Sequence, residues 1–189
     1  YGTTTGSYNV ALGKDALASN TTASNNTAVG YQAAYSNTTG YQNTAFGTTA
    51  LYSNQTGILN AAFGTSALYY NTGSYNAACG VYALNSNTSG ANNTAVGYYS
   101  LGSNTTASNN TAVGYQAGYS GTTASRGVYI GRQAGYSAVS SILNTFIGDV
   151  AGYTTTGDRN TAVGGAALYS NSTGSYNTCL LYTSDAADE

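Results

Sequence analysis

Very few side chains in this sequence could do acid–base, nucleophilic or metal chemistry. The 189 residues include no histidine, two cysteines, four basic residues and six acidic residues. Without histidine, Ser-His-Asp and Cys-His arrangements and most zinc sites are excluded. Phosphate-binding loops need a strand that leads into a helix, and no segment has a helical pattern. We therefore expect no catalytic residue, no metal site and no cofactor.

The few charged residues gather in one part of the chain. Five of the seven that precede residue 179 lie between residues 110 and 159. One interpretation is a ligand patch, and its candidate binding residues are Arg126, Tyr129, Arg132, Asp149 and Arg159. The interpretation we favour is a repacked stretch with a surface salt bridge, because such ion pairs are common and contribute little to stability. A glycosidase-like pair of Asp149 and Asp158 is disfavoured, since carboxylates on repeat proteins are usually solvated turn residues.

These residues belong to a repeat that runs through the chain. A clear copy is N-T-A-V-G-Y-Q-A-A-Y-S-N-T-T-G-Y-Q, residues 26–42. Its first glycine recurs at intervals of 17 residues, or of 16 in two places. The recurring glycines are Gly13, Gly30, Gly47, Gly64, Gly80, Gly97, Gly114, Gly131, Gly148 and Gly164. This period is too short for helix-pair repeats and is long enough for two short strands and two turns.

The two shortened copies show where the turns lie. Each lacks one residue in the segment that corresponds to N-T-T-G at residues 37–40. A deletion is tolerated in a turn, whereas in a strand it would move every later side chain to the other face. We therefore assign residues 37–40 to a turn, and the stretches around residues 28–29 and 33–34 to strands.

Stacking of the copies defines the predicted fold. Like residues would lie on like about 4.8 Å apart in a parallel sheet. Columns of asparagine and stacked aromatic rings would stabilise this arrangement, as they do in cross-β assemblies. The prediction is an all-β fold, a parallel β-solenoid (β-roll) with 17-residue coils and about ten and a half coils.

Adjacent apolar residues raise the question of what covers the sheet. Pairs such as Ala28-Val29 and Ala50-Leu51 would put apolar groups on both faces, because neighbouring strand residues point in opposite directions. Either these pairs lie at bends, or a second chain covers the other face; we favour the second chain. Cys79 falls in the same column as Val29, and we expect it to be a small core residue.

Two further column patterns predict contacts. The column of Leu51, Leu68, Leu84 and Leu101 becomes glycine at 118, 135 and 152. Nearby, an alanine column becomes Tyr129 and Phe146. In these coils a large side chain replaces alanine in one column, and glycine replaces leucine in the other. Because the two changes compensate in volume, we expect the two columns to be in contact. Arg132 and Asp149 share a column on successive coils, which predicts an ion pair.

The two ends of the chain differ in their relation to the repeat. The chain begins in mid-repeat, and we expect it to be a segment of a longer protein whose repeat domain spans residues 1–178. Residues 179–189 leave the pattern and look like a translated sequencing adapter, so we expect a non-native tail. Without that tail the domain has four basic and three acidic residues. This balance predicts no nucleic-acid binding, and no apolar run predicts membrane insertion of this segment.

The N-T-A-V-G core, followed by x-x-A-L, resembles the N-S-x-A-x-G repeats of trimeric autotransporter adhesin heads and similar repeats in phage tail fibres. The resemblance covers residues 1–178. Those families form parallel trimers of solenoids that present a long surface to host cells or matrix. The resemblance therefore implies a homotrimer, an extracellular, cell-surface or virion location, and a glycan or protein receptor on a host cell or other surface.

The predicted function is a structural and adhesive fibre segment in which many weak, identical contacts act through avidity. The alternative is an ice-binding solenoid, because threonines form a regular column and flat threonine arrays can order water. That column comprises Thr27, Thr44, Thr94, Thr111, Thr145 and Thr161. A threonine ladder also suits β structure for reasons of packing alone.

Overall fold

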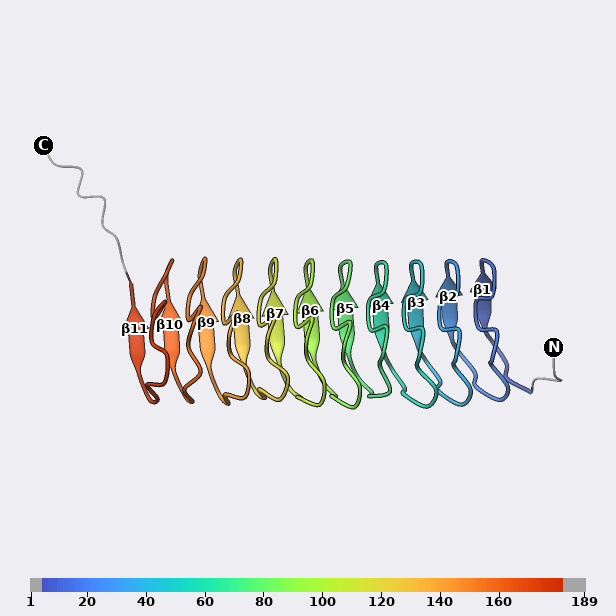
Figure 1. The fold of residues 1–189 in the computed structure, drawn as a ribbon. Helices are drawn as coiled ribbons and strands as arrows, with labels where there is room; N and C mark the ends of the chain where they lie inside the picture. The colour runs from blue at the N-terminus through green and yellow to red at the C-terminus, as the bar shows by residue number, and fades with distance from the viewer. Residues whose placement is uncertain (1–4, 182–189) are drawn as a thin grey trace, which may run out of the picture.

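The computed structural model describes residues 5–181 as a rod of stacked coils (Figure 1). Each coil contributes one three-residue strand, and eleven strands form a single parallel sheet in chain order. The described residues contain no helix. These findings confirm the predicted β-solenoid. The strands are β1 (Val10–Leu12), β2 (Thr27–Val29), β3 (Thr44–Phe46), β4 (Ala61–Phe63), β5 (Ala77–Cys79), β6 (Thr94–Val96), β7 (Thr111–Val113), β8 (Val128–Ile130), β9 (Thr145–Ile147), β10 (Thr161–Val163) and β11 (Thr178–Leu180).

The register places like residues on like along the rod. Ala28 of β2 pairs with Ala45 of β3, and the alignment continues across the first 16-residue interval, where Ala62 of β4 pairs with Ala78 of β5. The shortened copy therefore keeps its strand in register. This confirms that the missing residue belongs to a turn, because a change of strand length would have shifted the pairing by one residue.

The second strand predicted near residues 33–34 does not form. Gln32 and Ala34 have φ angles of 52° and 49°, which are left-handed rather than extended values. Hydrogen bonds still run between coils on this side, since the Ala34 N–H donates to the Ala50 carbonyl at 2.9 Å. The coil consequently has one sheet and, opposite it, a stack of turns that carries its own ladder of backbone hydrogen bonds.

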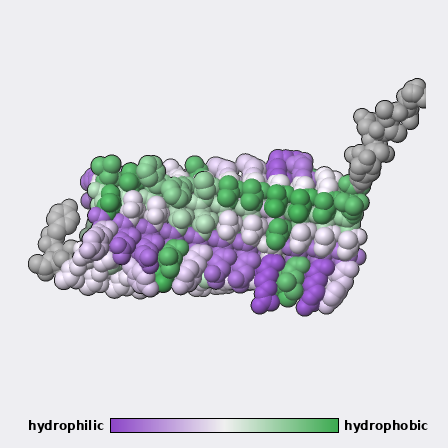
Figure 2. Space-filling view, turned by 180° about the vertical axis from the view of Figure 1, so that it is seen from behind, coloured by the Kyte–Doolittle hydropathy of each residue, from purple (hydrophilic) through white to green (hydrophobic). Residues whose placement is uncertain are grey.

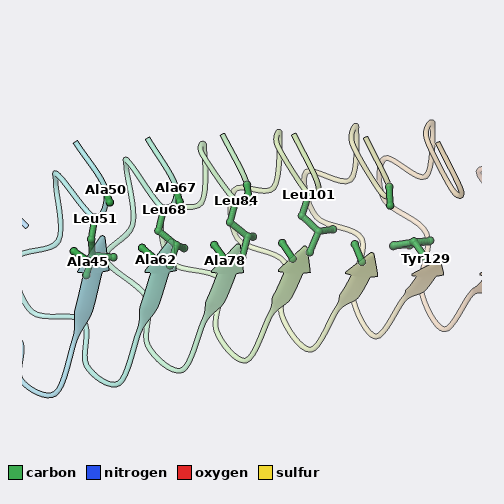
Figure 3. Close-up of a cluster of buried hydrophobic side chains, with 14 of the residues drawn as sticks. Ala45, Ala50, Leu51, Ala62, Ala67, Leu68, Ala78, Leu84, Leu101 and Tyr129 are labelled. Carbon is green, nitrogen blue, oxygen red and sulfur yellow. The ribbon is translucent and has the colours of Figure 1, made fainter. Parts of the chain in front are cut away.

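The interior between the sheet and the stacked turns is narrow. The middle residue of a strand points into it, so Ala45 is fully buried, and leucines reach across from the turns (Figure 3). Ala50 and Leu51 are both buried although they are neighbours in sequence. Leu51 has a φ of 56°, and this bend turns both side chains inward. For the Ala50-Leu51 type of pair, the bend is thus the correct alternative.

Buried asparagines satisfy the backbone where the coil enters the strand. The Asn43 backbone N–H donates to Asn26 Oδ1 at 2.9 Å, and the Asn60 N–H donates to Asn43 Oδ1 at 2.9 Å. Asn43 Nδ2 donates to the Gly57 carbonyl at 2.8 Å. Each side chain therefore serves its own coil and the next, which is how a buried polar ladder remains fully bonded. A second buried column contains Asn37, Asn54, Asn71, Asn87 and Asn104.

The recurring glycine ends each strand at a point where successive backbones approach closely. Gly97 has a φ of 127°, and a Cβ atom there would lie 2.5 Å from the carbonyl oxygen of Gly114 in the next coil. Both the backbone angle and the contact exclude a side chain at this position. The glycine column is thus required by the stacking itself.

The outer face of the sheet carries two rows of side chains that flank the inward alanines. Thr44 and Phe46 lie on either side of Ala45 in β3, and Phe46 is 54% exposed. Cys79 holds the equivalent position beside Ala78 and is exposed, so the expectation that it is a core residue was wrong. The apolar row forms a green band along the rod (Figure 2). It consists of Leu12, Val29, Phe46, Phe63, Cys79, Val96, Val113, Ile130, Ile147, Val163 and Leu180.

The stacked structure continues past the predicted domain boundary at residue 178. Cys179 and Leu180 lie in β11, paired with Ala162 and Val163 of β10. They fit because their side chains suit the inward and outward positions that these columns require. The remainder of the predicted tail, residues 182–189, lies outside the described residues.

Candidate functional site

The five predicted binding residues do not form one patch. Arg126 and Arg159 precede strands β8 and β10, whereas Arg132 and Asp149 follow β8 and β9. Tyr129 is the middle residue of β8 and points inward. The five residues therefore occupy three separate regions. Arg126 and Arg159 lie along the edge of the sheet where the strands begin, Arg132 and Asp149 lie along the edge where the strands end, and Tyr129 lies in the core.

Tyr129 is a core residue that replaces several smaller side chains. It is 1% exposed, and it belongs to the same buried cluster as Phe146. A Cβ atom added to Gly118 or Gly135 would overlap its ring, and one added to Gly127 would overlap its hydroxyl group. This confirms that the leucine and alanine columns exchange volume. It also explains why glycine replaces asparagine at residue 127.

The hydroxyl group of Tyr129 is buried near the hydroxyl group of Ser141. Burial raises the pKa of Tyr129 to about 12, and the nearby Ser141 hydroxyl offsets part of that rise. Among the described residues, neither hydroxyl reaches a partner with hydrogen-bond geometry. The tyrosine therefore stays neutral throughout the ordinary pH range and is inaccessible to a surface ligand.

Arg132 and Asp149 form the predicted ion pair between successive coils. Arg132 Nε lies 2.8 Å from Asp149 Oδ1, and Arg132 Nη2 donates to Asp149 Oδ2 at 2.8 Å. The hydrogen bond to Asp149 raises the pKa of the Arg132 guanidinium, which thus remains charged. Both side chains are 56% exposed. The pair is bidentate but solvated, so it neutralises its own edge of the sheet and contributes little to stability.

Arg126 and Arg159 lie on the opposite edge, in a column we term the cationic edge, formed by Arg126, Leu143, Arg159 and Tyr176. These residues occupy equivalent positions on four successive coils, and each backbone N–H donates to a carbonyl of the preceding coil. All four are exposed. Arg159 Nη1 donates to Tyr176 Oη at 2.7 Å, and its guanidinium lies 5.2 Å from the Tyr176 ring centroid.

Two members of this edge, Leu143 and Tyr176, were absent from the predicted site. Their position in the repeat could have indicated them. Leu143 and Tyr176 each stand one residue before the recurring asparagine, and Arg126 and Arg159 hold the same position in their coils. In the repeat, Arg126 and Arg159 share one position and Arg132 holds a different one, after the recurring glycine.

A tyrosine ladder runs along the turn side of the rod. Tyr35 stacks on Tyr52 with ring centroids 5.2 Å apart and an interplanar angle of 6°. Tyr136 and Tyr153 stack in the same way at 5.1 Å and 11°. Because neighbouring rings cover each other's faces, the ladder stabilises the stack and leaves mainly ring edges for a ligand.

Metal-binding groups and long apolar helices are both absent from residues 5–181. This part of the chain holds no group of three or more histidine, cysteine, aspartate or glutamate residues that could hold a metal ion. Nor does it contain a helix long and apolar enough to span a membrane. Cys79 and Cys179 are both free.

Comparisons of the chain with models of known protein families, with curated proteins and with solved structures found no match. The fold alone therefore defines its class. The chain is a tandem-repeat protein with a parallel β-solenoid fold.

Proposed function

We propose that this chain is a segment of a structural fibre that assembles as a homotrimer and attaches to cells, glycans or matrix from an extracellular, cell-surface or virion location. The observation that supports this proposal is the outer face of the sheet. Its two side-chain rows run the length of the rod and contain no charged residue. Among residues 5–181, no segment of the single chain covers them.

The size of this face is consistent with an interface between copies. Eleven rungs of three residues give a strip of about 50 Å by about 10 Å, or roughly 500 Å². About half of this strip is the apolar row, and exposed apolar patches of a few hundred Å² on soluble proteins are often functional. A pair of such strips buries ~1,000 Å², the size that specific interfaces need. Depletion of charge is typical of interface centres. Closed symmetry would cover the face on every copy, and the trimer follows from the resemblance to adhesin heads.

Attachment would then fall to the surfaces that the assembly leaves free. These surfaces repeat tyrosine, threonine and serine side chains from coil to coil, whereas the recurring asparagines are buried. Contacts that are weak individually gain strength when many of them engage one target. A fibre segment of this kind needs neither a pocket nor a catalytic group.

Cys79 provides a direct test of the proposed assembly. It lies in the apolar row of the outer face, so a parallel trimer brings three copies of Cys79 to the same height near the common axis. In a Cys179→Ser background, a short bis-maleimide should produce covalent dimers. Adding Val96→Lys and Val113→Lys, which put charge into the row, should abolish them. Absence of cross-linking before these substitutions would contradict the trimer.

Ice binding is the second candidate, and it competes for the same face. Thr94 and Val96 project from this face, and equivalent residues repeat at about 4.8 Å along the rod and about 6.7 Å across the strand. A regular, uncharged array of this kind could order water only if no other copy covered it. Thermal hysteresis of the full chain that disappears in Thr94→Lys/Thr111→Lys would favour this function. The fibre proposal predicts no hysteresis.

A further inference from the structure

We propose that the cationic edge binds an acidic polysaccharide lying along the rod. This inference rests on the proposed fibre function and specifies its receptor as a sulfated or carboxylated glycan. It is carried by the arrangement of Arg126, Leu143, Arg159 and Tyr176 on successive coils. The core position of Tyr129 and the pairing of Arg132 with Asp149 remove the other members of the predicted patch.

The two guanidinium groups share one exposed line parallel to the rod axis. Arg126 and Arg159 are two coils apart, so their backbones are separated by about 10 Å. Leu143 stands between them and carries no competing charge. Both arginines have left-handed backbone angles, with φ of 60° and 54°, at the tip of the turn before the strand. A flexible linear polyanion could therefore contact both groups without a pocket.

The nearest carboxylates do not neutralise this edge. Asp149 pairs with Arg132 on the far side of the strands, and this is the only ion pair among residues 5–181. Asp158 is adjacent to Arg159, but its Oδ1 accepts the Ile142 backbone N–H at 2.9 Å. The Asp158 carboxylate keeps its negative charge, so two arginines against one aspartate leave this edge with a net charge of +1.

The chemistry of the edge suits a glycan. Guanidinium groups bind sulfate and carboxylate oxygens through paired N–H donors, and Tyr176 holds Arg159 in position by stacking. Asn92 and Asn109 continue the same column with amides that can bond sugar hydroxyls. Single-stranded nucleic acid is usually bound by basic grooves with several aromatic rings on which bases stack, whereas the cationic edge has two arginines and one tyrosine.

The test is binding of the full chain to immobilised heparin, with neutral dextran as the uncharged reference. Arg126→Gln/Arg159→Gln should weaken heparin binding tenfold or more. Arg132→Gln removes a cation from the opposite edge and should change the affinity less than twofold. All three substituted side chains are exposed, and equal thermal unfolding midpoints would show that the fold is intact.

Four results would overturn the inference. Unchanged heparin binding in Arg126→Gln/Arg159→Gln would show that the edge is not the site. An equal loss in Arg132→Gln would reduce the effect to net charge. Single-stranded DNA that binds more tightly than heparin and depends on Arg126 and Arg159 would assign the edge to nucleic acid. A chain that binds heparin as a monomer would contradict the proposed fibre and leave this inference intact. A trimer that does not bind heparin would contradict this inference and leave the proposed fibre intact.

Discussion

The ring of Tyr129 packs so closely against Gly135 that a Cβ atom on Gly135 would overlap it. Other coils place alanine and leucine at these two positions, as in Ala62 and Leu68. Gly135→Leu alone should destabilise the protein by about 1–3 kcal/mol through overpacking, and Tyr129→Ala alone by about 3–5 kcal/mol through the cavity it leaves. Combining the two substitutions restores the alanine–leucine pair of the other coils. The double variant should therefore lose less stability than the two single variants lose together. Denaturant unfolding of all four proteins measures this coupling, and strict additivity would contradict the contact.

The glycine column gives a second prediction. Gly97→Ala should cost about 2 kcal/mol or more, because a Cβ atom there would lie 2.5 Å from the Gly114 carbonyl oxygen and the φ of 127° is unfavourable for alanine. Gly165→Ala is the matched control, since no atom lies within 4 Å of its Cβ position. Thermal unfolding of both variants checks this. Equal unfolding temperatures for Gly97→Ala and Gly165→Ala would contradict the close approach of successive coils at Gly97.

The asparagine ladder gives a third prediction. Asn43→Ala leaves the Asn60 N–H without its partner, whereas the Gly57 carbonyl keeps the hydrogen bond that Asn54 Nδ2 donates to it. A buried orphan of this kind costs about 1–3 kcal/mol, and we expect a loss of this size in the free energy of unfolding measured with denaturant. Thr39→Ala, which truncates an exposed side chain, should change stability by less than about 0.5 kcal/mol. If Asn43→Ala lost as little stability as Thr39→Ala, a structural role for the asparagine ladder would be excluded.

The buried Tyr129 hydroxyl predicts a specific alkaline sensitivity. Its pKa in the folded chain is raised to about 12, so the folded state holds the proton after the unfolded chain, with a pKa near 10, has released it. The stability linked to this proton is therefore complete below pH 10 and is lost as the pH rises from 10 to 12. The difference amounts to about 2–3 kcal/mol.

Tyr129→Phe isolates this effect from the other tyrosines. Phenylalanine already occurs at the equivalent position, Phe146, and the lost hydroxyl has no well-formed hydrogen bond. The variant should thus be at least as stable as the parent at pH 7, and it should lose less stability between pH 10 and 12. Parallel pH profiles for the two proteins would contradict the buried position of the hydroxyl.

The features that depend on register were predictable from the recurring positions in the sequence. The parallel stack, the turn at residues 71–73 and the Arg132–Asp149 pair all follow from placing like residues one coil apart. These predictions succeed because a solenoid converts sequence distance into position along its axis. The fit of Tyr129 beside Gly135 was predictable for the same reason, since volume lost in one column reappears in its neighbour.

Features that depend on backbone direction were harder to predict. The predicted strand near Ala34 is a turn because φ alternates in sign there, and the run Tyr-Gln-Ala-Ala-Tyr at residues 31–35 gives no sign of left-handed geometry. Cys79 was placed inside because both columns of the strand are apolar, yet only the middle residue points inward. The candidate patch failed at Tyr129 for a related reason, since its column is the inward one.

The assembly of the outer face can be tested most directly by the mass of the full chain in solution, measured by light scattering over a range of concentrations. The proposed trimer predicts a species of three times the 19.1 kDa chain mass, and Val96→Lys/Val113→Lys, which put charge into the uncharged apolar row, should reduce it to a monomer. A parent chain that remains at 19.1 kDa at every concentration would contradict the fibre and leave the apolar face without a partner chain.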